Sequence, residues 1–433
     1  MSYTWADVGS TWATIGGNTW QSLFLPPLEP STAETRVELG LQRAFLLDDP
    51  IAGIIGGTTF VLSGEEYVDI TNYVFSVSTD RGKNTELDRY KSGTASIQLR
   101  NQNRYFDPTY LESPFAGNLT PRRGIRILSN SVPIFTGRVA DWNIDYAPGN
   151  DSVASIEAVD NFTLLATQLL TAGTVVQQTT GQRISAVLNM PTVDWPTNEQ
   201  IIGTGQSTLG SAVLTGEENT LTYLQQVELS EFNGALFIDK AGYLVFRDRL
   251  EALEAPIAAT FTDDGTGIRF TDFAIEYGSE QLYNQVTVTS PAGTAVANDF
   301  SSQSLYGISS KFFDTLLSSQ TQLDLAAGFI KIRYSTPTLR IKQLSVNLKD
   351  LTELERATLL ELELADGARV IVTPNGIGDP IDKHQIVIGI SHDIDVANHV
   401  MTFSFGELQT DVFTIGDPVL GTIGVNAPGV LGF

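Results

Sequence analysis

The chain has 433 residues, 42% of them hydrophobic and 18% charged, so it is long enough for two to four folded domains and too apolar for a disordered protein. Its formal net charge of −24 disfavours sequence-independent binding to nucleic acid or to an anionic membrane. Because there is no cysteine, disulfides, thiol nucleophiles and thiolate metal sites are excluded.

Residues 1–34 form a distinct arm that is rich in tryptophan. Trp5, Trp12 and Trp20 are separated by Gly, Ala and Asp, and the arm closes with the proline-rich residues 25–30. Large aromatic side chains in a segment without periodicity are hard to bury within that segment. We therefore expect these tryptophans at an interface, either with the first domain of the same chain or with another subunit.

The arm begins with no basic and apolar leader, and no later segment holds eighteen uninterrupted apolar residues. We therefore expect a protein without a membrane segment that is made and assembled in the cytoplasm.

Residues 35–165 read as a first β domain. Ala95, Ile97 and Leu99 alternate with polar residues, as do Trp142 and Ile144. Each run has one apolar and one wet face, which is typical of antiparallel strands in a small barrel or sandwich.

An ordered series of short motifs runs through residues 81–162. It contains Arg-Gly, Asn-x-x-Arg-Tyr-Phe-Asp-Pro, Ser-Pro-Phe, Pro-Arg-Arg-Gly-x-Arg-Ile, Pro-Ile-Phe-x-Gly and Val-Asp-Asn, in that order. This order resembles minor tail proteins of long-tailed bacteriophages. Within that group it is similar to the baseplate hub, or tail-associated, protein that caps the tail tube.

Residues 166–252 change to a helical period. Ile184, Val187 and Leu188 predict a short helix that ends near residue 191, and a second helix follows Asn219. Two apolar runs within residues 234–247 flank a turn at 239–242 and predict a β-hairpin. A helix followed by such a hairpin also resembles the middle of phage hub proteins.

Residues 253–411 return to strands and form a second β domain with one helical insertion. We expect strands within 268–270, 273–277, 285–289, 368–372, 385–390 and 399–405, and a helix through Leu323, Ala326, Ala327 and Ile330. Motifs near 282–288, 333–337 and 389–394 extend the hub resemblance to roughly residues 40–420.

Residues 412–433 form an apolar C-terminal tail punctuated by Gly and Pro, and we expect it to pack on something. The predicted interface residues are thus those of the arm and those of the tail: Trp5, Trp12, Trp20, Val412, Phe413, Leu420 and Phe433. Some hub proteins continue into a needle, a peptidase or a muralytic domain beyond the part that this chain resembles, and we do not expect those activities here.

The search for chemistry returns no catalytic set and no metal site. His384, His392 and His399 lie eight and seven residues apart on predicted strands, which favours structural histidines; a metal that bridges copies of the chain is the alternative. Residues 203–210 hold glycines without the complete pattern of a dinucleotide or phosphate loop or of a nucleophile elbow, and we expect a flexible loop there.

Paired acids occur at residues 65–66, 217–218 and 263–264. Neighbouring acids on strands or turns face opposite ways or into water, so we interpret them as solvated. The sequence therefore predicts no catalytic residue and no cofactor.

The expected fold is mainly β (α+β), with two β-barrel-like domains, a mixed α/β middle region and a few short helices. The resemblance implies a structural hub that forms a homotrimeric ring with pseudo-sixfold symmetry at the virion tail tip. Its implied partners are the tail tube or distal tail protein above it, tip, fibre and tape-measure proteins, and genome DNA that passes through without specific binding.

Two alternatives remain open. The protein could bind or cleave cell-wall glycan at the tail tip, since tryptophan-rich segments stack on sugars. It could also be the distal tail protein, a neighbouring hexameric ring.

Overall fold

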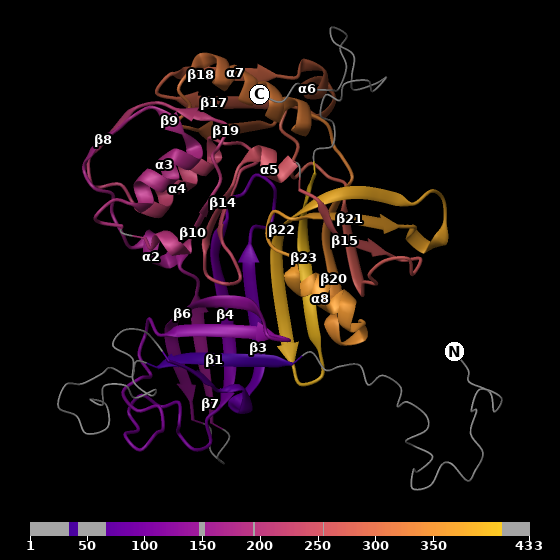
Figure 1. Ribbon diagram of the computed structural model, residues 1–433. Helices are drawn as coiled ribbons and strands as arrows, with labels where there is room; N and C mark the ends of the chain where they lie inside the picture. Colours follow the sequence, from indigo (N-terminus) through magenta and orange to yellow (C-terminus); the bar gives the residue numbers. More distant parts are fainter. Residues whose placement is uncertain (1–33, 42–65, 147–151, 194, 254, 409–433) are drawn as a thin grey trace, which may run out of the picture.

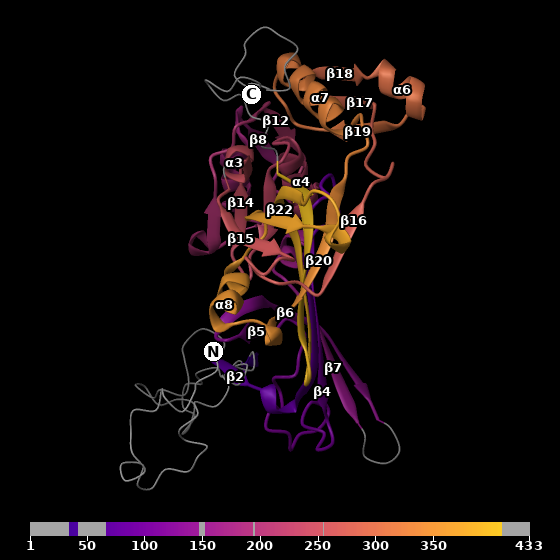
Figure 2. The ribbon, with the colours of Figure 1, turned by 90° about the vertical axis from the view of Figure 1, so that its right-hand side faces the viewer.

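The computed structural model describes residues 34–41, 66–146, 152–193, 195–253 and 255–408. Within these ranges most strands belong to one 13-stranded sheet that runs along the molecule (Figure 1). Helices pack beside this main sheet, and a small α/β unit projects from one end (Figure 2). No helix in the described part of the chain is long and apolar enough to cross a membrane.

The first β region forms one half of the main sheet, in the order β3-β4-β7-β6-β5-β1-β2, with antiparallel neighbours. The expected alternation is confirmed, because Ala95, Ile97 and Leu99 are buried and the residues between them are more exposed. The strands are β1 (Thr35–Leu41), β2 (Glu66–Asp69), β3 (Val74–Gly82), β4 (Lys91–Arg100), β5 (Gly124–Ser129), β6 (Val132–Asp145) and β7 (Val153–Val159).

The Arg-Tyr-Phe-Asp-Pro motif after β4 builds a packed loop. Asp107 pairs with Arg104 at 2.6 Å and accepts hydrogen bonds from the Thr109 amide at 2.8 Å and the Tyr146 hydroxyl at 2.5 Å. The neighbouring Phe106 is fully buried. The motif is therefore a structural element of the first β region.

The middle region contains the predicted helices and hairpin. Helix α3 begins with a capping box between Thr179 and Gln182, and the Asn219 side chain caps α4. The elements are α2 (Phe162–Ala166), β8 (Gly173–Val175), β9 (Gln178–Thr179), α3 (Thr180–Leu188), β10 (Gln200–Ile202), β11 (Thr208–Leu209), β12 (Ala212–Leu214), α4 (Thr220–Leu229), β13 (Ala235–Ile238), β14 (Leu244–Arg247) and α5 (Arg249–Leu253).

The third region supplies the other half of the main sheet, with β16-β20-β23-β22 leading to β3 and with β21 joining β22 to β15. Of the predicted strands, the one at 268–270 is reduced to a single bridge between Ile268 and Phe261. The elements are β15 (Ile257–Thr262), β16 (Asp272–Glu276), β20 (Arg340–Asn347), α8 (Glu353–Glu361), β21 (Gly367–Val372), β22 (Ile381–Asp395) and β23 (His399–Glu407).

The two β regions share one sheet. Residues 76–82 of β3 pair antiparallel with residues 389–395 of β22. At this junction Gly82 has a φ of 104°, and a Cβ there would lie 2.3 Å from the carbonyl oxygen of Ile388, so the close approach requires glycine. The two β regions are thus continuous through a strand pair.

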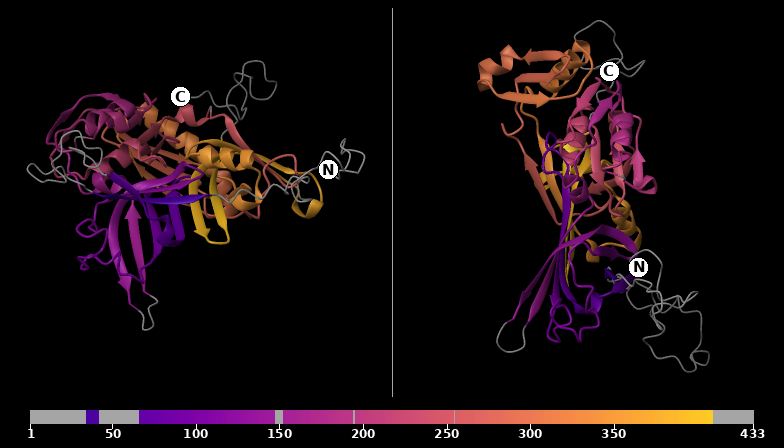
Figure 3. Two further views of the ribbon diagram at one scale, coloured as in Figure 1. Left: turned by 60° about the horizontal axis from the view of Figure 1, so that its bottom comes forward. Right: turned by 90° about the vertical axis from the view of Figure 1, so that its left-hand side faces the viewer.

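Residues 285–334, here called the insertion module, are inserted in the sequence between β16 and β20, which pair with each other in the main sheet. The module contains β17 (Gln285–Ser290), β18 (Gly293–Asn298), α6 (Phe300–Tyr306), β19 (Ser310–Asp314) and α7 (Gln320–Tyr334). Helix α7 is the predicted helix, and its residues Leu323, Ala326, Ala327 and Ile330 pack on the three-stranded sheet in a separate core. Figure 3 shows the module projecting beyond the main sheet.

Candidate functional site

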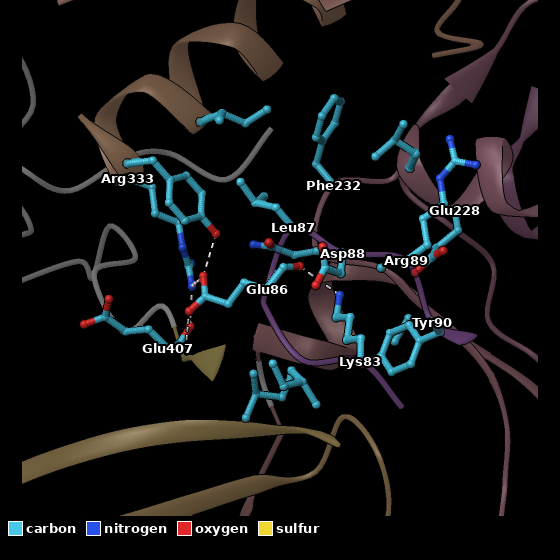
Figure 4. Close-up of a pocket in the computed structure, with 18 of the residues that line it drawn as sticks. Lys83, Glu86, Leu87, Asp88, Arg89, Tyr90, Glu228, Phe232, Arg333 and Glu407 are labelled. Carbon is cyan, nitrogen blue, oxygen red and sulfur yellow. Dashed lines mark hydrogen bonds and ion pairs between the residues drawn. The ribbon is translucent and has the colours of Figure 1, made fainter. Parts of the chain in front are cut away.

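A charged pocket lies where the insertion module meets the main sheet (Figure 4). Its walls come from loop 83–90 between β3 and β4, from the end of α4, from α7, from residues 386–388 within β22 and from the end of β23. Leu408, the last described residue of the chain, belongs to the lining. The pocket therefore joins four parts of the chain that are distant in sequence.

The carboxylate of Glu86 is the centre of this pocket. Its Oε2 is 3.0 Å from Nη2 of Arg333 and accepts a hydrogen bond from the Tyr334 hydroxyl at 2.5 Å, while Oε1 accepts from the Glu407 amide at 2.5 Å. Arg333 also donates to the carbonyl oxygen of Glu407. Burial opposes ionisation of Glu86, but Arg333 and these donors outweigh it, so the pKa of the carboxyl is lowered.

Two further ionisable side chains, Lys83 and Glu228, lie on the opposite side of the pocket. Lys83 donates from Nζ to the carbonyl oxygen of Glu86 at 2.9 Å and lies 4.5 Å from the ring centroid of Tyr90. Burial lowers the pKa of Lys83 and raises the pKa of Glu228 to about 7, and each group partly counteracts the shift of the other. Glu228 thus titrates near neutral pH.

These contacts tie the insertion module to the main sheet. Arg333 and Tyr334 end α7, whereas Glu86 and Glu407 belong to the other side of the junction. Both oxygens of Glu86 are used by donors of the protein itself. Within the described ranges, no group of three or more His, Asp or Glu residues is placed to hold a metal ion.

The structure brings two of the three histidines together. His392 Nδ1 lies 3.0 Å from His399 Nε2 across β22 and β23, and the two side chains are 2% and 0% exposed. Burial lowers the pKa of His392 well below its ordinary value and that of His399 to about 4, so the pair is neutral at neutral pH. Both rings are covered by residues of their own chain, which fits structural histidines. His384 lies elsewhere on β22 and is half-buried.

The glycine-containing segment 203–210 differs from the flexible loop that we expected. Its backbone is anchored: the Gly203 amide donates to the Phe246 carbonyl at 2.8 Å, and the Ser207 amide donates to Oε2 of Glu231 at 3.0 Å. Glu231 is fully buried and also accepts from the Thr180 hydroxyl at 2.5 Å. A buried carboxylate requires such donors, and here the segment supplies them.

The paired acids hold turns. Glu218 accepts from the amides of Thr215 and Gly216 at 3.0 Å, and these bonds lower its pKa to about 2. Asp263 accepts from the Thr373 amide at 2.7 Å, and Asp264 accepts from the Thr266 amide at 2.9 Å. Asp263 and Asp264 are exposed, as expected of solvated acids, and all three carboxylates also accept hydrogen bonds from the backbone.

All seven predicted interface residues lie outside the described part of the chain: Trp5, Trp12, Trp20, Val412, Phe413, Leu420 and Phe433. Their assignment stays a prediction. The described residues show instead an exposed apolar surface on the insertion module, with Phe300, Leu305 and Ile308 each at least 70% exposed. The sequence did not predict this surface. Apolar residues near a strand are normally assigned to the core, and only the folded structure shows which of them stay exposed.

Two solved structures share the fold over almost their whole length. The 43 kDa tail protein of prophage MuSo2 from Shewanella oneidensis has a TM-score of 0.55 and 13% identity, and the match covers 87% of this chain and 97% of that protein. A tail protein from Neisseria meningitidis MC58 has a TM-score of 0.56 and 13% identity, with 86% and 96% covered. This chain has the tail-protein fold.

The tail-protein fold confirms the mainly β class and, at the level of fold, the resemblance to phage tail proteins. No family model and no curated protein matches the sequence. At 13% identity the likeness shows the tail-protein fold alone, and the role within a tail is a separate question.

Proposed function

We propose that this protein is a structural component of a bacteriophage tail and, more narrowly, the hub of the tail tip or baseplate. The observation that carries the proposal is the match to a prophage tail protein over 97% of that protein's length. A shared insertion or a single shared domain would cover much less. The order of motifs in residues 81–162 supports the narrower assignment to a hub.

As a hub, three copies would form a ring that caps the tail tube and, through two β regions per chain, matches a hexameric tube above and a threefold tip below. The tail tube or distal tail protein, tip or fibre proteins and the tape-measure protein are its proposed partners. The protein would be assembled in the host cytoplasm and would reside at the tail tip of the virion.

Genome passage follows from the same proposal. A net charge of −24 favours a lumen whose carboxylates repel the phosphates of DNA, so that the genome passes without binding. The proposal includes no catalytic activity and no cofactor. A map of the assembled ring with a neutral or basic lumen would contradict the passage part.

The first test is the native mass of the full-length protein by light scattering on a size-exclusion column, across a range of concentrations. We expect a stable trimer with a central channel in electron micrographs. A hexamer would favour the distal tail protein over the hub. A monomer that does not change with concentration would contradict self-assembly into a ring.

A zymogram on host cell wall and a glycan-binding screen test the alternative function. We expect no clearing and no glycan bound. Clearing that is abolished by one Glu or Asp substitution would overturn the structural proposal in favour of a wall-active protein.

A further inference from the structure

A second pocket, lined mainly by polar groups, lies where the first β region meets the β13–β14 hairpin. It shares no lining residue with the charged pocket of Figure 4. Its lining comes from β2, β5 and β6, from the hairpin turn at 241–243 and from residues 161 and 198–199. The lining includes the side chains of Tyr67, Arg126, Arg138, Asn198, Glu199 and Tyr243. We call it the arginine pocket.

Arg126 and Arg138 supply the positive charge of the arginine pocket. Strand register makes them diagonal neighbours on one face of β5 and β6. The Arg126 guanidinium lies 3.7 Å from the ring centroid of Tyr67. Nη1 of Arg138 donates to the carbonyl oxygen of Arg122 at 3.3 Å. An aromatic ring and a backbone carbonyl thus hold the two guanidinium groups in place and leave their charges unneutralised.

Neither guanidinium group has an ion-pair partner in the ranges that the structure describes. Glu38 faces Arg126 across β1 and β5, but it pairs with Arg36 at 2.9 Å. Nε of Arg138 is buried and meets no acceptor among the described residues. Because a guanidinium group has five N–H donors, both arginines keep donors for a ligand that brings acceptor oxygens.

The wall that the hairpin contributes is anchored to the first β region. The Thr136 hydroxyl of β6 donates to the carbonyl oxygen of Lys240 at 3.0 Å. The Asn161 side chain donates to the carbonyl oxygen of Gly242 at 3.3 Å. A pocket with walls that are already fixed loses little conformational freedom when a ligand binds.

The charge of the lining indicates which ligand fits. Among the described residues that line the pocket, Glu199 is the one acid beside the two arginines, so the formal charge of the lining is +1. A carboxylate carries one negative charge and has two oxygens that match a planar guanidinium group. A phosphate monoester carries a charge of about −2 and would leave the pocket negative.

We propose that the arginine pocket binds the carboxylate of an Asp or Glu side chain presented by another protein chain. Arg126 is exposed, so a side chain from outside the molecule can reach it. The rings of Tyr67 and Tyr243 offer apolar surface for the methylene groups that carry the carboxylate. A second copy of this chain and a different protein would supply the same chemistry, and the experiments below separate these two sources.

The arginine side chains can report binding directly. The full-length protein is labelled with isotopic arginine, and the Nε–H signals are followed by NMR while the capped peptide Gly-Glu-Gly is added. Replacing each arginine by glutamine assigns its signal. We expect saturable shifts of the Arg126 and Arg138 signals. The capped peptide Gly-Gln-Gly has nearly the same shape without the charge, and we expect no shift with it.

Two variants separate a site from general attraction between charges. We expect Arg126→Gln to weaken binding of Gly-Glu-Gly about tenfold, measured on the Arg138 signal, because hydrogen bonds to charged groups are strong. The matched control is Arg100→Gln, which removes one exposed positive charge at the end of β4 in the same β region. We expect it to change the dissociation constant less than about twofold.

Three results would overturn the proposal. They are the absence of saturable shifts, equal weakening by Arg126→Gln and Arg100→Gln, and tighter binding of inorganic phosphate than of Gly-Glu-Gly. The last result would reassign the pocket to phosphate groups.

Native mass, measured by light scattering, separates the two sources of the carboxylate. If a second copy supplies it, Arg126→Gln should shift the protein toward smaller assemblies, and Arg100→Gln should not. If a different protein supplies it, both variants should keep the native mass while Arg126→Gln still weakens peptide binding.

The inference does not rest on the proposed hub function. Peptide binding is measured on the pocket of each chain, whereas the hub proposal depends on the number of copies in the native protein. Either can therefore fail while the other stands.

Discussion

Buried charges in this protein join segments that are far apart in the sequence. Arg81 of β3 and Glu363 after α8 form an ion pair of 2.9 Å, with side chains 3% and 11% exposed. Removing one partner of a buried pair leaves an uncompensated charge. We expect Arg81→Met to lower the free energy of unfolding by about 3–5 kcal/mol, measured by urea denaturation.

The control for this substitution is Arg369→Met, which breaks the 2.5 Å pair with Asp382 at the surface, where both side chains are about 40% exposed. We expect it to cost less than about 1 kcal/mol, because exposed pairs are screened by solvent. Similar losses for the two variants would show that the Arg81 pair does not depend on burial.

Glu228 predicts a pH dependence of stability. Its pKa in the folded protein is about 7, above the ordinary value of 4.5, so its stabilisation is complete below pH 4.5 and is lost as the pH rises through 7. We expect Glu228→Gln to remove this loss. Between pH 4 and pH 8, the free energy of unfolding of the variant should rise relative to that of the native protein by up to about 3 kcal/mol. Urea denaturation across this pH range measures the difference.

The histidine pair works in the opposite direction. The pKa values of His392 and His399 are lowered, so their stabilisation is present above pH 6.5 and is lost as the pH falls toward 4. The native curve sums both effects, and the test is therefore the difference between Glu228→Gln and the native protein. A constant difference across the pH range would contradict the assignment to Glu228.

At the scale of elements, two helical glycines should respond in opposite ways to the same change. A Cβ on Gly181 in α3 would lie 1.8 Å from the carbonyl oxygen of Gly203, in the anchored segment. A Cβ on Gly328 in α7 would have no heavy atom within 4 Å. We expect Gly181→Ala to destabilise by more than about 2 kcal/mol and Gly328→Ala to stabilise by about 0.5–1 kcal/mol in thermal or urea unfolding.

If Gly181→Ala were neutral, the packing of α3 against residues 203–205 would be looser than the structure shows. If Gly328→Ala were strongly destabilising, α7 would have a close neighbour at that position. Each result can be read without the other, since the two sites lie in different packing units.

Elements with a local signal were predictable. Asn219 predicted the start of α4, and the turn at 239–242 predicted the hairpin β13–β14. Helix α8 was missed although Thr352 and Glu355 form a capping box at its start. Its inward face holds Arg356, fully buried and donating to the carbonyl of Leu351 at 3.1 Å. A buried arginine interrupts the helical spacing of apolar residues from which a helix is predicted.

At the scale of the whole molecule, the junction in Figure 4 decides how firmly the insertion module is held. Arg333→Met would leave the buried Glu86 without its cation. We expect the free energy of local opening of α7 and β17 to fall by about 2–4 kcal/mol, seen as faster hydrogen exchange there, with β3 and β22 unchanged.

Lys331→Met is the matched control, since it removes one positive charge from the last turn of α7 and leaves Arg333 in place. Uniformly faster exchange over the whole molecule, or equal effects of the two variants, would show that the Glu86–Arg333 pair does not hold the insertion module locally.

The sequence by itself determined the mainly β class, the strands with alternating burial, three helices and the hairpin, because each depends on residues close together in the chain. The motif order also indicated the tail-protein fold. Only the tertiary structure decided that β3 joins β22, that Glu86 meets Arg333, and which face of the insertion module stays open. These contacts depend on pairing between distant segments, and the same apolar and charged residues are compatible with many pairings until the chain is folded.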